Sequence, residues 1–114
     1  MKPVRTGQLK HRVTVKRRKF IQGKYDELGN ELWEEEVVGT YWALIESRTG
    51  SLLKGRTAET ILTNTTHVIT MRYHPAIDHA CWIEYQGHHF DIDYVSDPDF
   101  QKTWMQVYVR EEVG

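Results

Sequence analysis

The stretch CWIEYQGHHFDIDYV, residues 81–95, contains two runs of alternating apolar and polar residues separated by the pair Gln-Gly. Alternation with a period of two is typical of a β-strand that buries one face. Glycine in such a pair readily adopts the positive φ angle that a tight hairpin turn requires. The stretch therefore predicts two antiparallel strands joined by a turn at Gln86 and Gly87.

The same alternation continues outward from this hairpin in both directions. It appears in LKHRVTVKRRKF (9–20), where Leu9, Val13 and Val15 share one face, and again in WEEEVVGTYWALIES (33–47), HVITMRY (67–73) and TWMQVYVRE (103–111). Several short strands with regular turns predict an all-β fold, a small antiparallel β-barrel or sandwich of about six strands. We expect residues 1–114 to form one such domain, because this length is within the usual size of a single domain.

Glycine and polar residues mark the connections between these runs. QGKYDELGNE (22–31) predicts a long hairpin loop, and Gly39 within an apolar run predicts a bulge or bend. Residues 49–66, TGSLLKGRTAETILTNTT, lose the alternation and predict one long loop with at most one or two helical turns around TAETIL. Loops of this length in a small domain are usually functional or mobile.

The composition is that of an ordinary soluble protein. Charged residues make up 27% of the chain, and the longest apolar run is the five residues YWALI. A membrane helix needs about 20 apolar residues, so we expect no membrane association. The single cysteine has no partner for an internal disulfide, which favours a reducing compartment such as the cytoplasm.

Charge is segregated along the chain although the net charge is only −1. Residues 1–24 hold nine Lys or Arg and no acid, whereas residues 25–36 hold six acids and no base. One interpretation is that neighbouring strands pair a basic edge with an acidic edge. The other is a basic stripe that faces nucleic acid. Both interpretations involve the run KRRK at residues 16–19.

Four histidines and the only cysteine occur within residues 74–89, a composition that raises the question of a zinc site. His79 and Cys81 are two residues apart, but His88 and His89 are consecutive in a strand and must point to opposite faces. No Cys-x-x-Cys or His-Glu-x-x-His spacing supports them. We therefore expect no metal ion and no other cofactor.

A catalytic cluster is also disfavoured. His89, Asp91 and Asp93 share one predicted strand face and include the groups that proton transfer uses. The same arrangement is the plain solvent face of a strand whose other face carries Phe90, Ile92 and Tyr94. We expect no catalytic residues and no enzymatic activity.

The order of motifs resembles that of the tailed-phage head–tail joining proteins, also called head-closure or stopper proteins, of siphophage-like virions and prophages. The similar segments are GQLKHRVTV (7–15), DELGNELWEEEVVGTYWALIESRTG (26–50), THVITMRYHPAI (66–77) and WIEYQGHHFDIDYVSDP (82–98). The segment SLLKGRTAETILTNTT (51–66) matches poorly. The resemblance covers most of the chain, from Gly7 to about Val109.

The resemblance implies a structural role without catalytic residues. Members of this family look like small antiparallel β-barrels or sandwiches with one long loop. The implied function is to join the DNA-filled head, at its portal or adaptor ring, to the tail. The implied partners are further copies in a six- or twelve-fold ring, the portal or adaptor and tail proteins, and packaged double-stranded DNA in the lumen. The implied location is the virion neck, after assembly in the host cytoplasm.

Three groups of residues are candidates for such contacts. The first group is basic and would face the lumen, DNA or a neighbouring subunit: Lys16, Arg17, Arg18 and Lys19. The second is acidic and would meet a neighbouring subunit: Glu34, Glu35 and Glu36. The third is a plug or docking loop: Gly50, Leu52, Leu53, Lys54, Gly55 and Arg56.

Two other functions remain as alternatives. The first is a small nucleic-acid-binding β-barrel in which aromatic side chains stack on bases. Against it, Trp42, Trp82 and Trp104 alternate with polar residues, which favours a place in the core. The second, weaker alternative is a metal-dependent hydrolase that uses His79, Cys81 and a third donor.

Overall fold

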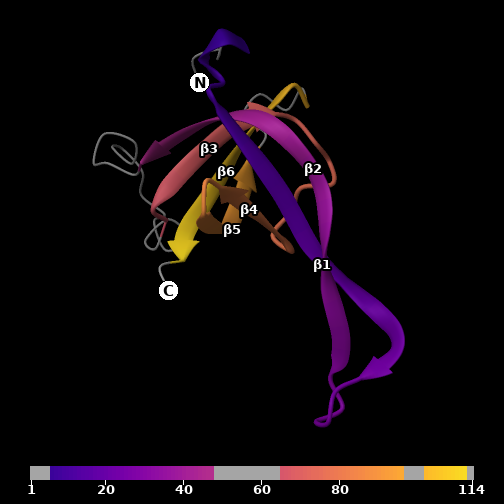
Figure 1. Ribbon diagram of the computed structural model, residues 1–114. Coiled ribbons are helices and arrows are strands. Elements are labelled where there is room, and N and C mark those ends of the chain that lie inside the picture. The colour runs from indigo at the N-terminus through magenta and orange to yellow at the C-terminus, as the bar shows by residue number, and fades with distance from the viewer. Residues whose placement is uncertain (1–5, 48–64, 97–101, 113–114) are drawn as a thin grey trace.

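The computed structural model describes residues 6–47, 65–96 and 102–112. A short 3-10 helix, η1 (Thr6–Gln8), precedes six strands. The strands are β1 (His11–Tyr25), β2 (Glu31–Ser47), β3 (His67–Arg72), β4 (Cys81–Tyr85), β5 (His88–Ser96) and β6 (Trp104–Glu112). They pair antiparallel in the order β1-β2-β3-β6-β5-β4, and β4 returns to β1 to close a barrel (Figure 1). The predicted all-β fold of about six strands is confirmed, and of the two predicted architectures, barrel or sandwich, the structure has the barrel.

The core fills the barrel interior with alternate residues of every strand. Val13 and Val15 of β1 are fully buried, as the alternation of residues 9–20 predicts. A barrel of this strand number is narrow enough for side chains alone to fill it. The other core residues are Ala43, Ile69, Met71, Ile77, Cys81, Ile83, Phe90, Ile92, Met105, Val107 and Val109.

The β4–β5 hairpin turns at the predicted pair. Gln86 and Gly87 both have positive φ, 47° and 86°. Positive φ at both central residues is typical of the type I′ turn, whose twist matches that of the flanking strands. The turn is confirmed, and the positive φ of Gln86 is an addition that the sequence did not indicate.

The predicted irregularity at Gly39 is a β-bulge. Val15 of β1 pairs with Gly39, but the next residue, Lys16, pairs with Val37. Val38 is therefore the extra residue in β2, and a bulge of this kind bends the strand and increases its twist. The C-terminal half of β2 can then lie in the barrel wall while its N-terminal half extends away from the barrel.

The hairpin loop predicted over residues 22–31 is present but shorter. β1 continues to Tyr25 and β2 begins at Glu31, so the connection is only residues 26–30. The strands extend because Gly23, at φ 77°, absorbs a register shift between Phe20 and Tyr25. Of the glycines and acids that indicated a loop, Gly23 and Glu31 lie in the strands, whereas Asp26, Glu27 and Gly29 lie in the connection.

Two aromatic residues also lie elsewhere than predicted. Ile92 pairs with Val109 and Tyr94 with Tyr108, so Asp93 is an extra residue that reverses the alternation of β5. Tyr94 is consequently exposed rather than on the Phe90 and Ile92 face. Trp42 is 52% exposed, because it lies on the outer side of the barrel wall. Among the described residues, no helix is long and apolar enough to cross a membrane.

Gly39→Ala tests the close packing at the β2 bulge. A Cβ atom at residue 39 would overlap the phenol ring of Tyr41, which itself contacts the His74 ring at 4.0 Å between centroids. We expect Gly39→Ala to lower the free energy of unfolding by about 1–3 kcal/mol. The measurement is urea unfolding followed by tryptophan fluorescence.

Tyr41→Ala provides the control for this substitution. In the Tyr41→Ala background the added methyl group has no ring to displace, so the two effects should not be additive. Equal costs for Gly39→Ala in both backgrounds would show that the backbone at residue 39, and not the Tyr41 ring, sets the penalty.

Candidate functional site

A two-stranded arm protrudes from the barrel and is its most prominent external feature (Figure 1). We define the arm as residues 18–36. β1 pairs with β4 only over Thr14–Arg17, and β2 pairs with β3 only over Ala43–Ser47, so the arm strands pair only with each other. The molecule is consequently elongated, 49 × 29 × 28 Å.

The arm carries apolar side chains that face solvent. Leu28 at its tip is 87% exposed. The others, which are 40–58% exposed, are Phe20, Tyr25, Leu32 and Trp33. A two-stranded ribbon is marginally stable by itself, and contiguous exposed apolar residues are typical of interaction surfaces. The arm is therefore a candidate contact surface.

The predicted basic and acidic groups meet each other across the base of the arm. Lys16 Nζ lies 3.0 Å from Glu35 Oε2, Arg17 Nε donates to Glu36 Oε1 at 2.6 Å, and Lys19 Nζ lies 3.9 Å from Glu36. These are ion pairs within one chain, as the cross-strand interpretation of the segregated charge requires. The predicted contact of both groups with a neighbouring subunit stays a prediction.

Arg18 and Glu34 take no part in these ion pairs. The Arg18 guanidinium lies over the Trp33 ring, 4.8 Å from its centroid. Glu34 lies opposite Lys19 in the strand register and is exposed. Glu35 and Glu36 both form ion pairs with described residues, whereas Glu34 forms none with them.

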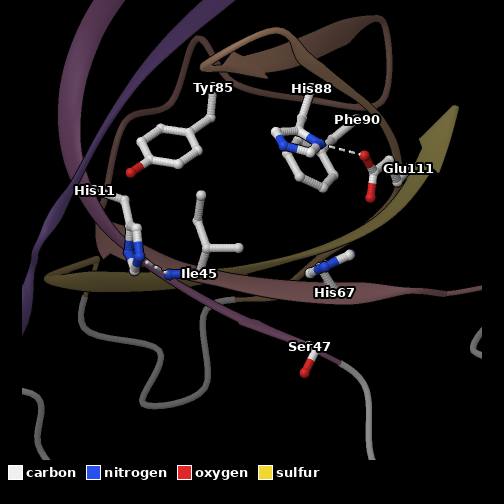
Figure 2. A pocket seen from close by; sticks show the side chains of 8 residues that line it. All are labelled: His11, Ile45, Ser47, His67, Tyr85, His88, Phe90 and Glu111. Atoms are coloured by element: carbon white, nitrogen blue, oxygen red, sulfur yellow. Dashed lines mark hydrogen bonds and ion pairs between the residues drawn. The ribbon is translucent and has the colours of Figure 1, made fainter. Parts of the chain in front are cut away.

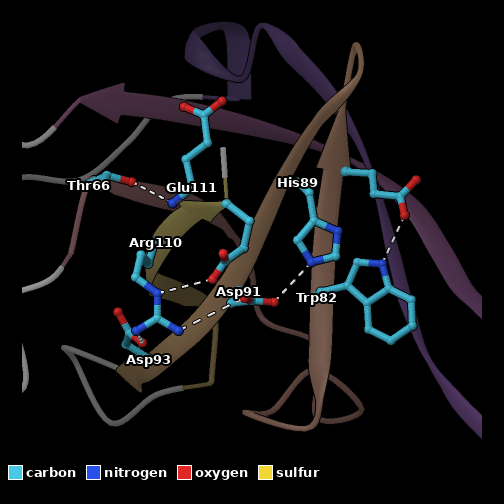
Figure 3. A network of polar contacts seen from close by, with 9 residues as sticks. Thr66, Trp82, His89, Asp91, Asp93, Arg110 and Glu111 are labelled. Atoms are coloured by element: carbon cyan, nitrogen blue, oxygen red, sulfur yellow. Dashed lines mark hydrogen bonds and ion pairs between the residues drawn. The ribbon is translucent and has the colours of Figure 1, made fainter. Parts of the chain in front are cut away.

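Trp82 fastens the base of the arm to the barrel. Its ring contacts Trp33 of the arm at 6.4 Å, edge to face, and stacks on His89 at 5.8 Å. Its Nε1 donates to Glu84 Oε2 at 2.9 Å, and Lys16 bridges Glu84 and Glu35. Figure 3 shows Trp82 beside His89, with its indole nitrogen directed at the carboxylate.

The His89, Asp91 and Asp93 cluster belongs to a charged network on β5 and β6 (Figure 3). His89 Nε2 lies 2.9 Å from Asp91 Oδ1, and Arg110 lies within 3.9 Å of Asp91 and 3.5 Å of Asp93. Burial acts to raise the pKa of Asp91, but neighbouring hydrogen bonds and positive charges hold it below its ordinary value. The ion pairs of Asp91 and Asp93 with Arg110 suit a charged surface better than proton transfer.

The histidines and the cysteine do not converge. His79 is exposed in the turn before β4, whereas Cys81 is buried in the core. Burial raises the pKa of the Cys81 thiol, which disfavours the nucleophilic thiolate. Within residues 6–47, 65–96 and 102–112, no group of three or more His, Cys, Asp or Glu is arranged to hold a metal ion.

One end of the barrel is open as a cavity of about 320 Å³. Figure 2 shows His11, Tyr85 and His88 around it, with Phe90 behind His88. His11 Nδ1 accepts a hydrogen bond from the Ile45 backbone N–H at 3.1 Å, and His88 Nδ1 contacts Glu111. These ring nitrogens are engaged in holding the barrel rim. The predicted plug loop, Gly50 to Arg56, lies outside the described residues.

Comparison with known proteins decides between the functions left open by this surface. Residues 4–112 match the family described as phage head completion protein. The chain belongs to the phage head completion protein family. Its role is therefore structural: it is a virion protein of the head–tail joining class, and its partners are other virion proteins.

Two solved structures share the fold of this head completion protein. Protein SF1141 from Shigella flexneri 2a is 23% identical, with a TM-score of 0.72 over 96% of this chain and 98% of that one. A chain in the virion of a native gene transfer agent particle is 18% identical, with a TM-score of 0.63 over 92% of this chain and 96% of that one. No curated protein sequence matches significantly.

The full extent of the arm was missed because its distal part, residues 22–31, was predicted to be a loop. One signal could have found it. Arg17 and Lys19 continue the parity of the buried Val13 and Val15, so β1 stops burying a face after Val15. Residues 34–36 of β2, which pair with this part of β1, are also acidic. Two paired strands without apolar residues on one face cannot pack on the core of this head completion protein.

Glu84→Gln tests the anchoring role of the Trp82 cluster. Burial acts to raise the pKa of Glu84, but hydrogen bonds from Trp82 and Lys16 outweigh it and hold the pKa below the ordinary 4.5. A lowered pKa in the folded state means that this stabilisation is complete above about pH 4.5 and is lost as pH falls through the folded pKa. We expect the variant to lose about 1 kcal/mol at pH 7, since Glu84 is partly exposed.

The measurement is the free energy of unfolding from pH 7 to pH 3. Wild type should lose more stability over this range than Glu84→Gln does. Glu46→Gln, at an exposed carboxylate on β2, should follow the wild-type curve. A Glu84→Gln curve parallel to wild type would contradict the role of this carboxylate.

Proposed function

We propose that this head completion protein forms a homo-oligomeric ring of six or twelve copies at the virion neck, between the portal or adaptor ring and the tail. Packaged double-stranded DNA passes through the lumen of the ring, and the ring helps to retain the genome. Family membership over residues 4–112 is the observation that carries this proposal. The fold shared with a chain of a gene transfer agent virion supports it.

The role proposed is that of a non-enzymatic part assembled in the host cytoplasm. The buried Cys81 thiol and the ion-paired Asp91 both lack the reactive state that catalysis would use. The loop around Gly50 to Arg56 is proposed as the plug or docking element that faces the DNA or a ring partner. Glu34 is proposed as a contact to a neighbouring subunit.

The nucleic-acid-binding alternative has less support. Lys16, Arg17 and Lys19 have carboxylate partners in the same chain, which reduces the charge available for phosphate. The Trp82 ring is only 8% exposed and stacks on His89, so it is not free to stack on a base. Basic residues at the lumen would then bind DNA phosphates only weakly, which suits a ring through which DNA must pass.

Deletion of the gene tests the joining role. We expect lysates of the deletion strain to contain heads without attached tails, because the surface that the tail recognises is missing. Added full-length protein should restore tailed particles. Electron microscopy counts the two kinds of particle, and nuclease digestion of released heads measures whether their DNA is retained.

A full-length, folded variant gives the control for this complementation. Glu46→Gln at the exposed carboxylate on β2 should restore tails as well as wild type does. Normal tailed virions in the uncomplemented deletion strain would overturn the joining role. Loss of tails with fully nuclease-protected DNA in the heads would overturn the retention role alone.

Oligonucleotide binding separates the two functions. We expect the purified chain to show no saturable binding of single-stranded DNA at physiological salt, measured by tryptophan quenching and fluorescence anisotropy. Tight binding that weakens steeply with salt would place the nucleic-acid alternative first. Lys16→Gln and Arg17→Gln would then be expected to reduce that binding.

A further inference from the structure

The arm contains two strand edges that barrel closure leaves unpaired. Within the part of the chain that the structure describes, β1 over residues 18–25 and β2 over residues 31–42 each pair with a neighbouring strand on one side only. We call their unpaired sides the β1 edge and the β2 edge. Figure 1 shows the arm extending away from the other strands. The backbone N–H and C=O groups along such an edge form a template on which another strand can be added.

A groove of about 400 Å³ lies where the β1 edge begins. β4 starts at Cys81, which pairs with Arg17, and from there β1 continues into the arm without β4 beside it. The lining of the groove includes Arg17, Arg18, Phe20, His79, Trp82 and Asp91. A strand added here would lie along β1 in line with β4.

The two edges differ in charge. Residues 18–25 contain three basic residues and no acid, whereas residues 31–42 contain four acids and no base. The side chains of a strand stand on its two faces, so they lie beside the strands on both of its sides. Like charges on facing strands repel, so two β1 edges or two β2 edges are disfavoured partners. Each edge is therefore best matched by the other.

Part of this charge has no ionic partner within the chain. Lys24, Glu31 and Glu34 are exposed, and none of them forms an ion pair with any described residue. The carboxylate in the groove is different, because Asp91 Oδ1 lies 2.9 Å from His89 Nε2. An added strand that carries carboxylates can therefore pair with the cations of the β1 edge.

The apolar side chains of the arm suit the same pairing. Phe20 lies opposite Trp33 in the register of one chain, and the two side chains are 53% and 43% exposed. A β2 strand added at the β1 edge can place its own Trp33 or Leu32 on the other side of Phe20. Aromatic and apolar cross-strand pairs of this kind stabilise neighbouring strands.

We propose that the β1 edge of one copy pairs with the β2 edge of a second copy, residues 18–25 against residues 31–37. The inference rests on the proposed ring and identifies the contact that joins its subunits. A second copy is the occupant because its β2 is the strand with which β1 already pairs in its own chain. That pairing places opposite charges face to face: Arg17 with Glu36, Arg18 with Glu35, and Lys19 with Glu34.

The pairing can repeat from copy to copy with one geometry. Within each arm β1 and β2 are antiparallel. When neighbouring arms are related by rotation about an axis along the arms, β2 of one copy runs antiparallel to β1 of the next. The two edges are different surfaces, so the contact is heterologous and repeats until the rotation closes the ring.

Photochemical cross-linking from the β1 edge tests the proposal. The full-length variant Phe20→p-benzoylphenylalanine complements the deletion strain, and the purified tailed virions are irradiated. We expect a covalent product of two chains, in which mass spectrometry places the cross-link within residues 31–37 of the second chain. The same probe at Tyr94, an exposed residue of β5, should give no product joined to residues 31–37.

Two results of this experiment would overturn the proposal. A product that joins Phe20 to a different virion protein would show that another protein occupies the β1 edge. Assembled virions without a product of two chains would show that no second copy lies there. If the Phe20 variant does not assemble, the probe at Val37, which is 57% exposed on β2, should reach residues 18–25 of a second copy, and the same two results would count against the pairing.

A charge exchange between two variants tests the same contact by function. Lys19→Glu/Lys24→Glu reverses charges of the β1 edge, and Glu31→Lys/Glu34→Lys reverses charges of the β2 edge. Each variant alone places like charges at every junction, so each should complement about 100-fold less well than wild type does. When the two are expressed together, junctions between unlike variants carry opposite charges, and the titre of tailed virions should recover to within about 10-fold of wild type.

Recovery in the mixture is specific to contacts between copies. The reversed charges remain mismatched inside each chain, so only pairing with a different chain can relieve them. Glu46→Lys makes a similar reversal outside both edges and should complement fully.

The outcomes separate this inference from the ring proposal. If wild type does not complement, the proposed function fails and the contact fails with it. If wild type complements and either reversed variant alone does so equally well, the edge pairing alone is overturned. The same holds if the mixture does not recover although thermal unfolding of both variants matches wild type. If a variant is unfolded, the cross-linking experiment decides, because it leaves every charge of the arm unchanged.

Discussion

The pairing of β1 with β4 over Thr14–Arg17 is the contact on which the rest of the structure depends. It closes the barrel, and closure removes the free edges that an open sheet would present. It also fixes the parity of β1, which directs Val13 and Val15 into the core. Because the pairing ends at Arg17 while β1 continues to Tyr25, it determines where the arm begins. The β-bulge at Val38 lets β2 follow β1 out of the barrel wall. The β1–β4 pairing therefore determines both the closure of the barrel and the position of the arm.

The segregated charges acquire a clear role within this arrangement. Lys16, Arg17 and Lys19 meet Glu35 and Glu36 where the ribbon leaves the barrel and no apolar core holds the two strands together. Exposed pairs of this kind contribute only about 0.2–1 kcal/mol each. Their larger effect is on register, because a slip by one residue would place every charge on the opposite face. The Trp33–Trp82 contact adds apolar packing at the same position.

The sequence was sufficient to predict an all-β barrel or sandwich, the Gln86-Gly87 turn and a bulge or bend at Gly39, because period-two burial and positive φ angles have direct signatures in residue type. It was insufficient for the arm, because a two-stranded ribbon without a core carries the same polar and glycine-rich composition as a loop. The exposure of Tyr94 was missed for another reason: a single extra residue, Asp93, reverses the alternation, and nothing in the residue types of β5 indicates it.

An arm that is marginal in one chain is well suited to a protein whose function is to join others. Its exposed Tyr25 and Leu28 add little to the stability of the single chain, yet the same area becomes buried when a partner covers it. In the proposed ring each contact can be weak, because closure makes the last contacts intramolecular and multiplies their effect. The features that cost the monomer stability are therefore those that make assembly depend on the presence of neighbouring virion proteins.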